Sequence, residues 1–384
     1  MANLFIVPKY IVAGQDALKD SINYLKGLGK KAFIVTDNMM IKLGAVARVI
    51  ETLEDAGIGY SIFCDVNSEP TDKIVIAGIN EYKRSGCDFL IGLGGGSPID
   101  AMKAIGAMIT NEGNITDYIG KVIESAPPTL VAIPTTAGTG SEATQFTIIS
   151  DVKNGVKMLL KGPSLVPTLA IIDPIFTLTA PQNVTAATGI DALTHAVEAY
   201  TSRKAQPLSD TIALSAIKRI YGSLLDAYND GANLKAREEM AIGALEAGIA
   251  FNNASVTLVH GMSRPIGALF HVPHGLSNAM LLEKCLDFAK DGAEIRFCDM
   301  AKAIGVYSDE MTVSDGAQRF LVAIKELLVS LKIDTLEDFG VEKEDFFENM
   351  DKMAGDALVS GSPQNTMKVP SKEEIIEIYK SLWN

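Results

Sequence analysis

The chain has 384 residues, of which 47% are hydrophobic and 21% are charged, so it is long enough to form two domains with sizeable cores. Its 47 acidic side chains against 34 basic ones give a net charge of −13, which repels phosphate backbones and excludes nucleic acid as an expected partner. No run of about 20 apolar residues occurs and no basic region precedes a long apolar stretch at the N-terminus, so neither a membrane span nor a signal peptide is expected.

The first part of the chain alternates strand-like and helix-like segments. Short apolar runs at 32–37, 58–63 and 88–93 predict strands, and the segments at 39–56 and 71–85 between them have helical spacing. Further strands are predicted at 130–134, 146–149 and 169–172. This order indicates parallel strands joined by right-handed crossovers. We therefore predict an α/β domain with a mostly parallel sheet over residues 1–180.

Two turns rich in small residues follow predicted strands. In the first, residues 94–100 (Gly-Gly-Gly-Ser-Pro-Ile-Asp), three glycines let backbone N–H groups approach an anion, and Ser97 can cap a helix with Pro98 at its first position. The second, residues 135–142 (Thr-Thr-Ala-Gly-Thr-Gly-Ser-Glu), follows the strand at 130–134. The pair suits a nucleotide lying across the ends of neighbouring strands. The first could equally be only a tight turn, because it is not the G-x-G-x-x-G fingerprint, and the second only a flexible loop.

Prolines at 174 and 181 mark a domain boundary near 180. Beyond it the strand pattern fades, and segments near 184–202, 208–228, 235–252, 276–290, 313–331 and 372–382 have helical periodicity. We predict an all-α domain over residues 181–384.

One of these helical segments carries the chemistry around which we interpret the chain. Asp191 and His195 stand four residues apart and share one helix face, so a carboxylate and an imidazole can grip one divalent cation. Alternatively, the two side chains could form a surface hydrogen bond, or His195 could be a hydrogen-bonded histidine of the core. The distribution of histidines favours a metal site. The chain has four histidines, and the other three, His260, His271 and His274, lie within one short stretch.

The stretch 259–275 contains two prolines and three glycines, so it cannot be one straight helix. Folding back, it could bring His260 and His274 to a common point with Asp191 and His195. Three neutral imidazoles and one carboxylate suit Fe²⁺, or alternatively Zn²⁺, with room for an exchangeable fifth ligand. Calcium and magnesium would require more oxygen ligands.

With these motifs in order along the whole chain, the sequence resembles the iron-containing (group III) alcohol dehydrogenases, a family that includes lactaldehyde reductase and 1,3-propanediol dehydrogenase. The resemblance rests on residues 94–100, 133–142, 187–198 and 260–275. It implies a dehydroquinate-synthase-like nucleotide-binding N-domain, a helical C-domain and a metal between them, bound by Asp191, His195, His260 and His274.

The resemblance also implies the residues that contact the cofactor. The predicted set is Gly94, Gly95, Gly96, Ser97, Asp100, Thr135, Thr136, Thr139, Ser141 and Lys157, together with Asp37. Asp37 matches the acidic residue that often meets the adenosine ribose. A carboxylate there can bind a ribose 2′-OH and would repel a 2′-phosphate, so we expect NAD rather than NADP.

Two positions leave alternatives open. Several relatives carry a histidine four residues after the third ligand, where this chain has Arg264; the arginine could be structural, or it could steer a substrate that bears a carboxylate or other anion. His271, together with His260, is a predicted catalytic residue, and His271 could relay a proton or simply donate hydrogen bonds beside the metal.

The predicted function is metal-dependent hydride transfer between NAD(H) and a small primary alcohol or diol, or its aldehyde. The cation would activate the substrate oxygen as a Lewis acid while the nicotinamide carries the hydride. The alternatives are an NAD- and metal-using lyase of the dehydroquinate-synthase type and a non-catalytic binding protein. The family implies a homo-oligomer, at least a dimer. Four scattered cysteines without a CxxC motif predict free thiols, and hence a cytoplasmic protein.

Overall fold

The computed structural model describes residues 2–383 and divides into two compact units between residues 180 and 181, with residues 2–5 grouped with the C-terminal unit. Each unit is described by itself below.

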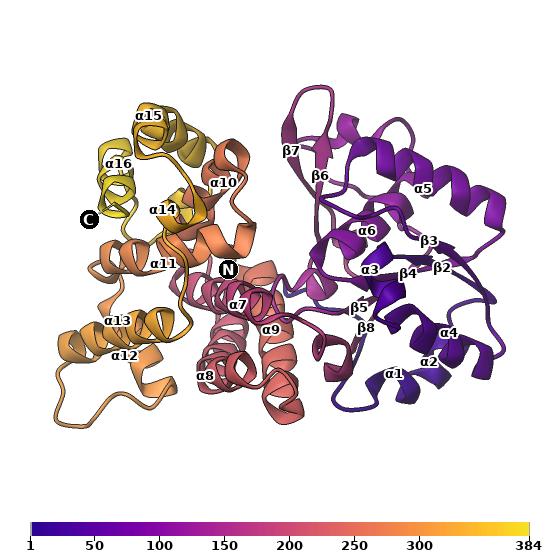
Figure 1. Ribbon diagram of the computed structural model, residues 1–384, viewed down its shortest axis with the longest axis horizontal. Helices are drawn as coiled ribbons and strands as arrows, with labels where there is room; N and C mark the ends of the chain where they lie inside the picture. Colours follow the sequence, from indigo (N-terminus) through magenta and orange to yellow (C-terminus); the bar gives the residue numbers. More distant parts are fainter. Residues whose placement is uncertain (1, 384) are drawn as a thin grey trace. The chain divides into compact units, whose positions relative to one another are not determined.

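The N-terminal unit is built on a parallel six-stranded sheet (Figure 1). Its strand order is β1-β8-β5-β4-β2-β3. The strands are β1 (Tyr10–Ala13), β2 (Lys31–Val35), β3 (Gly59–Phe63), β4 (Phe89–Gly94), β5 (Thr129–Pro134) and β8 (Leu169–Ile172). The helices are α1 (Ala17–Asp20), α2 (Ile22–Lys26), α3 (Asn38–Lys42), α4 (Ala45–Asp55), α5 (Asp72–Ser85) and α6 (Gly96–Thr110). A separate antiparallel hairpin joins β6 (Phe146–Asp151) to β7 (Val156–Lys161).

Both faces of the sheet are covered, as expected for parallel strands. Successive residues of β2 point to opposite faces, so that Phe33 and Val35 pack with α5 and α6 while Ala32 and Ile34 pack with α1 and α4. Figure 1 shows these two layers of helices on either side of the sheet. The predicted α/β class is confirmed for this unit.

The C-terminal unit contains helices and no strands among its described residues, which confirms the all-α prediction. The helices are α7 (Gln182–Thr201), α8 (Pro207–Asn229), α9 (Leu234–Ala254), α10 (Leu258–Phe270), α11 (His274–Lys290), α12 (Glu294–Ala303), α13 (Val313–Ser330), α14 (Leu336–Phe339), α15 (Lys343–Val359) and α16 (Lys372–Ser381).

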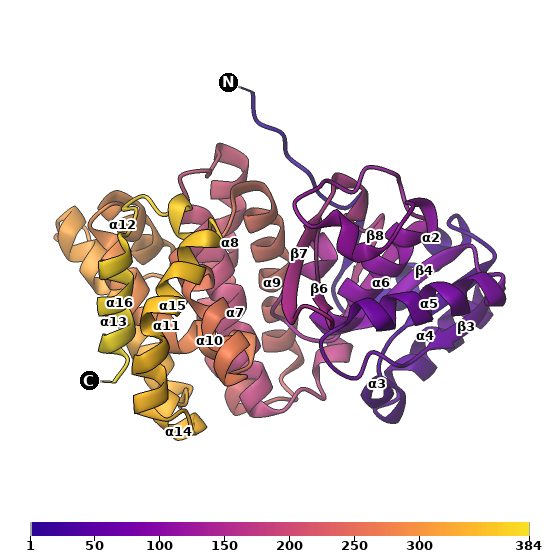
Figure 2. The ribbon, with the colours of Figure 1, turned by 90° about the horizontal axis from the view of Figure 1, so that it is seen from above.

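Helix α7 is the centre of this unit. It is buried over most of its length and packs against α8, α9 and α11. A Cβ added at Gly189 would lie 2.3 Å from Leu224 Cδ1 of α8, so glycine is needed for this close approach. Helix α10 packs against α11 and α15, and α15 against α16 (Figure 2). The residues at the centre of α7 are thereby held by neighbours on several sides.

Several predicted boundaries were wrong. The segment 39–56 is two helices, α3 and α4, because Gly44 between them has a φ of 77° that a helix cannot contain. Ser97 does not cap α6, and Pro98 is not its first residue: Gly95 is the N-cap and α6 begins at Gly96. Pro98 is tolerated there because first-turn N–H groups have no acceptor within the helix.

Other elements were missed. Strand β1 is a largely exposed edge strand, and β7 carries Lys157 and Lys161 on its exposed face, so neither shows a long apolar run. Most of the stretch 259–275 is helix α10, which continues through Pro265 and breaks only at residues 271–273. Helices α12 and α15 were not predicted either.

No single helix within residues 2–383 has the length and apolarity of a membrane span. Helices α9 and α10, which meet at 103°, meet these criteria only when taken together.

Candidate active site

Four side chains able to ligate a metal converge within the helical unit. Asp191 and His195 lie one turn apart on α7, His260 lies in the first turn of α10, and His274 is the first residue of α11. One ligand atom from each lies within 4.8 Å of the other three. Asp191 Oδ1 is 3.6 Å from Nε2 of both His260 and His274. Two bonds of about 2.1 Å to a shared ion can span such a gap, so the four donors fit one cation.

The environment of His195 favours a neutral imidazole. Its ring stacks on Phe251 at 4.2 Å and on His260 at 4.4 Å between centroids. Burial lowers the pKa of His195 to about 3 despite the neighbouring Asp191 carboxylate. Its buried Nδ1 has no hydrogen-bond partner among the described residues. A buried imidazole nitrogen without a partner is costly unless a ligand satisfies it.

The site is enclosed on one side and open on the other. The side chains of Asp191, His195 and His260 are all less than a tenth exposed, whereas that of His274 is 43% exposed. A small molecule can therefore approach this group of donors from the His274 side.

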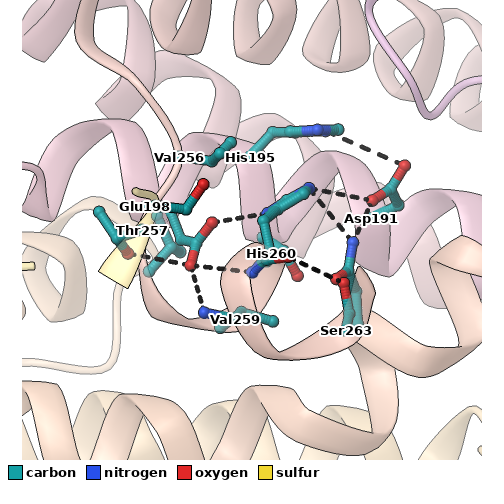
Figure 3. A network of polar contacts seen from close by, with 12 residues as sticks. Asp191, His195, Glu198, Val256, Thr257, Val259, His260 and Ser263 are labelled. Atoms are coloured by element: carbon teal, nitrogen blue, oxygen red, sulfur yellow. Dashed lines mark hydrogen bonds and ion pairs between the residues drawn. The ribbon is translucent and has the colours of Figure 1, made fainter. Parts of the chain in front are cut away.

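Glu198 orients His260 (Figure 3). Its Oε2 lies 2.6 Å from His260 Nδ1, and its Oε1 accepts hydrogen bonds from Val259 N at 2.6 Å and from Thr257 Oγ1 at 2.9 Å. Burial opposes charge on His260, yet Glu198 and Asp191 raise the pKa of His260 to about 9. Glu198 holds the Nδ1 proton, and a metal bound at Nε2 would take the place of the proton that Nε2 otherwise carries.

Asn278, one turn after His274 on α11, completes the cluster. Its Nδ2 lies 2.7 Å from Asp191 Oδ1, 3.2 Å from His260 Nε2 and 3.3 Å from His274 Nε2. Our sequence analysis found neither Glu198 nor Asn278. Helical spacing could have found both, because Asp191, His195 and Glu198 follow one helix face and Asn278 stands four residues after His274.

The predicted cofactor residues lie in the other unit, at the carboxyl ends of adjacent strands. Asp37 follows β2, Gly94 ends β4, and the threonine-rich turn follows β5. The two turns touch: a Cβ added at Gly95 would lie 3.4 Å from Thr136 Oγ1, and one added at Gly96 would lie 2.9 Å from Thr139 Cγ2. The first residues of α6 are partly exposed, and backbone N–H groups at a helix N-terminus suit a phosphate. Asp37 Oδ1 caps α3 by accepting from Met40 N, which leaves Oδ2 for a ribose hydroxyl.

Asp100 and Ser141 link the two turns beneath this surface. Ser141 Oγ donates to Asp100 Oδ1 at 3.1 Å, and Asp100 Oδ2 accepts from Ile148 N at 3.0 Å. Burial raises the pKa of Asp100 to about 6, although Lys103 opposes this shift.

Lys103, which our sequence analysis missed, is fully buried and donates to Thr144 O, Thr144 Oγ1 and Phe146 O. Burial lowers its pKa to about 8 and raises that of Glu142 to about 7. Burial in each case favours the neutral form, and the cluster ties α6 to the segment that follows β5.

Three other predicted residues lie outside these groups. Lys157 is on β7 and pairs with Glu69, without a hydrogen bond to either turn within the described chain. His271 is exposed at the C-terminus of α10, with a left-handed φ of 56°. Arg264, on α10, donates from Nη1 to Ser362 Oγ at 3.0 Å.

Comparison with known proteins identifies the family. Two family models match, "Iron-containing alcohol dehydrogenase" over residues 8–174 and "Fe-containing alcohol dehydrogenase family, C-terminal" over residues 185–383. The chain is 38% identical to a 1,3-propanediol dehydrogenase of Citrobacter freundii, over 98% of this chain and 97% of that protein.

Solved structures agree with these matches. The fold matches a crystal structure of 1,3-propanediol oxidoreductase with a TM-score of 0.95 and 36% identity over all of both chains. It also matches sulfoacetaldehyde reductase from Bifidobacterium kashiwanohense in complex with NAD⁺, with a TM-score of 0.87 and 28% identity over 100% of this chain and 99% of that chain. These matches confirm the predicted fold and do not favour the lyase alternative. The chain belongs to the iron-containing alcohol dehydrogenase family and is an NAD-dependent oxidoreductase of that type.

Proposed function

We propose that Asp191, His195, His260 and His274 bind one Fe²⁺, with Zn²⁺ as the alternative, and that this centre acts on small primary alcohols or diols and their aldehydes. The observation that carries the proposal is the convergence of four donor atoms from three helices within 4.8 Å. Nitrogen and carboxylate donors suit either metal, and so few oxygens disfavour calcium or magnesium.

The chain's own residues would prepare the site for this reaction. When bound, the cation would polarise the substrate oxygen and the nicotinamide would carry the hydride. Glu198 holds the Nδ1 proton of His260, so that the metal would displace the proton on Nε2 and bind at that nitrogen. Asn278 donates to Asp191 Oδ1 and fixes the direction of that carboxylate. His271, exposed at the end of α10, would exchange the reaction's proton with solvent.

For the cofactor, we propose that the Gly94–Ser97 turn and Thr135, Thr136 and Thr139 bind the pyrophosphate of NAD, and that Asp37 binds the adenosine ribose. The contact between the two turns and the unused Oδ2 of Asp37 support this assignment. Asp100 and Ser141 would support the two turns rather than contact the cofactor, since their side chains form a hydrogen bond with each other. The preference for NAD is wrong if turnover with NADPH equals or exceeds that with NADH.

We also propose a cytoplasmic homo-oligomer, at least a dimer. The four cysteines are unpaired, as in a reducing compartment. Strand β1 ends the sheet, and its exposed Tyr10 and Ile11 leave an apolar edge of the kind that a second chain can cover. Light scattering after size exclusion would measure the mass.

The function is tested on protein purified without oxygen. Metal content is measured first, and turnover of propanal with NADH and of 1,3-propanediol with NAD⁺ is then followed by absorbance, with and without added Fe²⁺ or Zn²⁺. Asp191→Ala and His260→Ala should lose metal and activity together while keeping the circular dichroism of the parent. Asp210→Asn is the control, since Asp210 pairs with Arg296 elsewhere in the unit. Full turnover by a metal-free variant would refute the proposal.

A further inference from the structure

Arg264 lies beside the metal-ligand group without a charged partner of its own. It stands four residues after His260 on α10, so the two side chains leave the same helix face about 5 to 6 Å apart at Cβ. The Arg264 side chain therefore starts next to the ligand group rather than on the far side of the helix.

The guanidinium is poorly satisfied for a partly buried cation. Its hydrogen bond within residues 2–383 goes to a neutral hydroxyl, Ser362 Oγ, at 3.0 Å, and no carboxylate of these residues lies within 4.0 Å of it. By contrast, Arg219 pairs with Glu239 and Glu246, and Arg296 pairs with Asp210.

An arginine carries five N–H donors, and a partly buried cation is normally paired with an anion. The acid that acts electrostatically on Arg264 is Glu198. Both oxygens of Glu198 are already engaged by Thr257, Val259 and His260. Arg264 thus has spare hydrogen-bonding capacity and positive charge beside the site.

We propose that Arg264 binds the anionic end of the substrate, so that this enzyme acts on short aldehydes and alcohols bearing a carboxylate a few carbons from the reacting oxygen. This inference rests on the proposed function of the metal centre. The planar guanidinium can bind a carboxylate through two parallel N–H···O bonds. His260 and Arg264 leave the same helix face, so one short substrate can contact both the metal and the guanidinium.

Electrostatics supports a dedicated cation at this point. The protein carries a net charge of −13, so its overall field repels an anionic substrate. The guanidinium of Arg264, which lacks a carboxylate partner within the described residues, offsets that repulsion locally, at the position where the anionic end of the substrate would bind. A neutral aldehyde would gain nothing from it.

The test compares two aldehydes of similar length, 4-oxobutanoate and the neutral pentanal, with metal-loaded enzyme and NADH. The parent should favour 4-oxobutanoate in kcat/KM. Arg264→Met, which keeps the apolar stem, should lose about 100-fold on 4-oxobutanoate, as expected for a charged bidentate contact, and only a few-fold on pentanal. Arg264→Lys should recover part of the loss, since a lysine keeps the charge but not the fork.

Binding without turnover gives a second readout. Calorimetry should detect succinate binding to the parent enzyme and a loss of that binding in Arg264→Met. Ser362→Ala is the matched control: it removes the internal hydrogen bond and leaves the guanidinium, so it should retain the preference for 4-oxobutanoate and the binding of succinate. If Arg264 served only to tie α10 to Ser362, both variants would lose the same thermal stability and neither would change the preference.

Equal losses on both aldehydes, or a parent enzyme that uses pentanal as well as 4-oxobutanoate, would overturn the inference while leaving the dehydrogenase function intact. A parent enzyme that reduces neither aldehyde, nor any short alcohol in the reverse direction, would overturn the proposed function and this inference with it.

Discussion

Replacement of Glu198 by glutamine should weaken metal binding far more than it weakens the fold. Glu198 accepts three short hydrogen bonds, from Thr257 Oγ1, Val259 N and His260 Nδ1. A glutamine has one oxygen, and the backbone N–H of Val259 can only donate, so the amide oxygen must face it. The amide NH₂ then faces His260 Nδ1 and forces the ring proton onto Nε2, the nitrogen that points to Asp191.

Metal binding by Glu198→Gln requires the proton to return to Nδ1, where it meets a donor instead of an acceptor. Leaving that buried pair unsatisfied costs about 1 to 3 kcal/mol, which corresponds to a roughly 5- to 150-fold increase in the dissociation constant of the metal. Loss of an orienting carboxylate has comparable effects at other histidine–metal sites.

Competition with a chelator measures the affinity, and ¹⁵N NMR of histidine in the metal-free protein above pH 9, where the His260 ring is neutral, reports which ring nitrogen carries the proton. Glu246→Gln is the matched control, since Glu246 is a partly buried acid of the same unit that accepts a hydrogen bond from Ser215 Oγ and forms an ion pair with Arg219 instead. Parental metal affinity in Glu198→Gln, with the proton still on His260 Nδ1, would refute the role given to Glu198.

Three further changes have definite expected outcomes. Gly96→Ala places a Cβ 2.9 Å from Thr139 Cγ2, and this overpacking should cost about 1 to 3 kcal/mol of folding free energy in the two turns. Fluorescence titration should then show NADH binding roughly tenfold weaker or more. An unchanged NADH affinity would show that this contact between the turns is not part of the cofactor site. Burial raises the pKa of Glu142 from 4.5 to about 7, so the folded protein binds this proton more tightly than the unfolded chain, and stability falls as the pH rises from about 4.5 to 7. In Glu142→Gln the melting temperature should fall less over this pH range. An identical pH profile in the parent and the variant would contradict the assignment. Removal of the metal with a chelator should lower the melting temperature and added Fe²⁺ or Zn²⁺ should restore it, but His195→Ala should show neither response.

Sequence spacing predicted the grouping of Asp191 and His195 because both lie on one helix, where residues four apart must be neighbours. Spacing alone could not place His274, which we assigned from the expected fold-back of residues 259–275 and from the family resemblance, since its position depends on where α10 ends. The helix continues through Pro265 and stops at His271, whose left-handed φ of 56° turns the chain so that α11 starts at His274. A break of three residues therefore decides which histidine joins the group, and no periodicity reports it.

Five of the six strands of the parallel sheet were predicted, all but the exposed edge strand β1, because parallel strands covered on both faces form continuous apolar runs, as in β4. Residues whose role depends on hydrogen-bond partners far away in the sequence were not predicted. Lys103 looks in the sequence like a surface lysine of α6, yet it is fully buried and satisfied by Thr144 and Phe146. Its partners lie about forty residues away, so the pattern within α6 contains no information about them.

The metal-ligand group combines a rigid half with an accessible half, and this division suits catalysis at a metal. Asp191, His195 and His260 are buried, and Glu198 and stacked rings fix the directions of the two histidines. His274 is 43% exposed on its side chain, so a substrate can enter and a product can leave past it without disturbing the other three donors. A fully buried set of four would hold a structural metal closed to substrate, whereas catalytic centres keep one side open. With a metal bound to these four residues, as proposed, the exposure of His274 would leave one side of the centre open to a substrate.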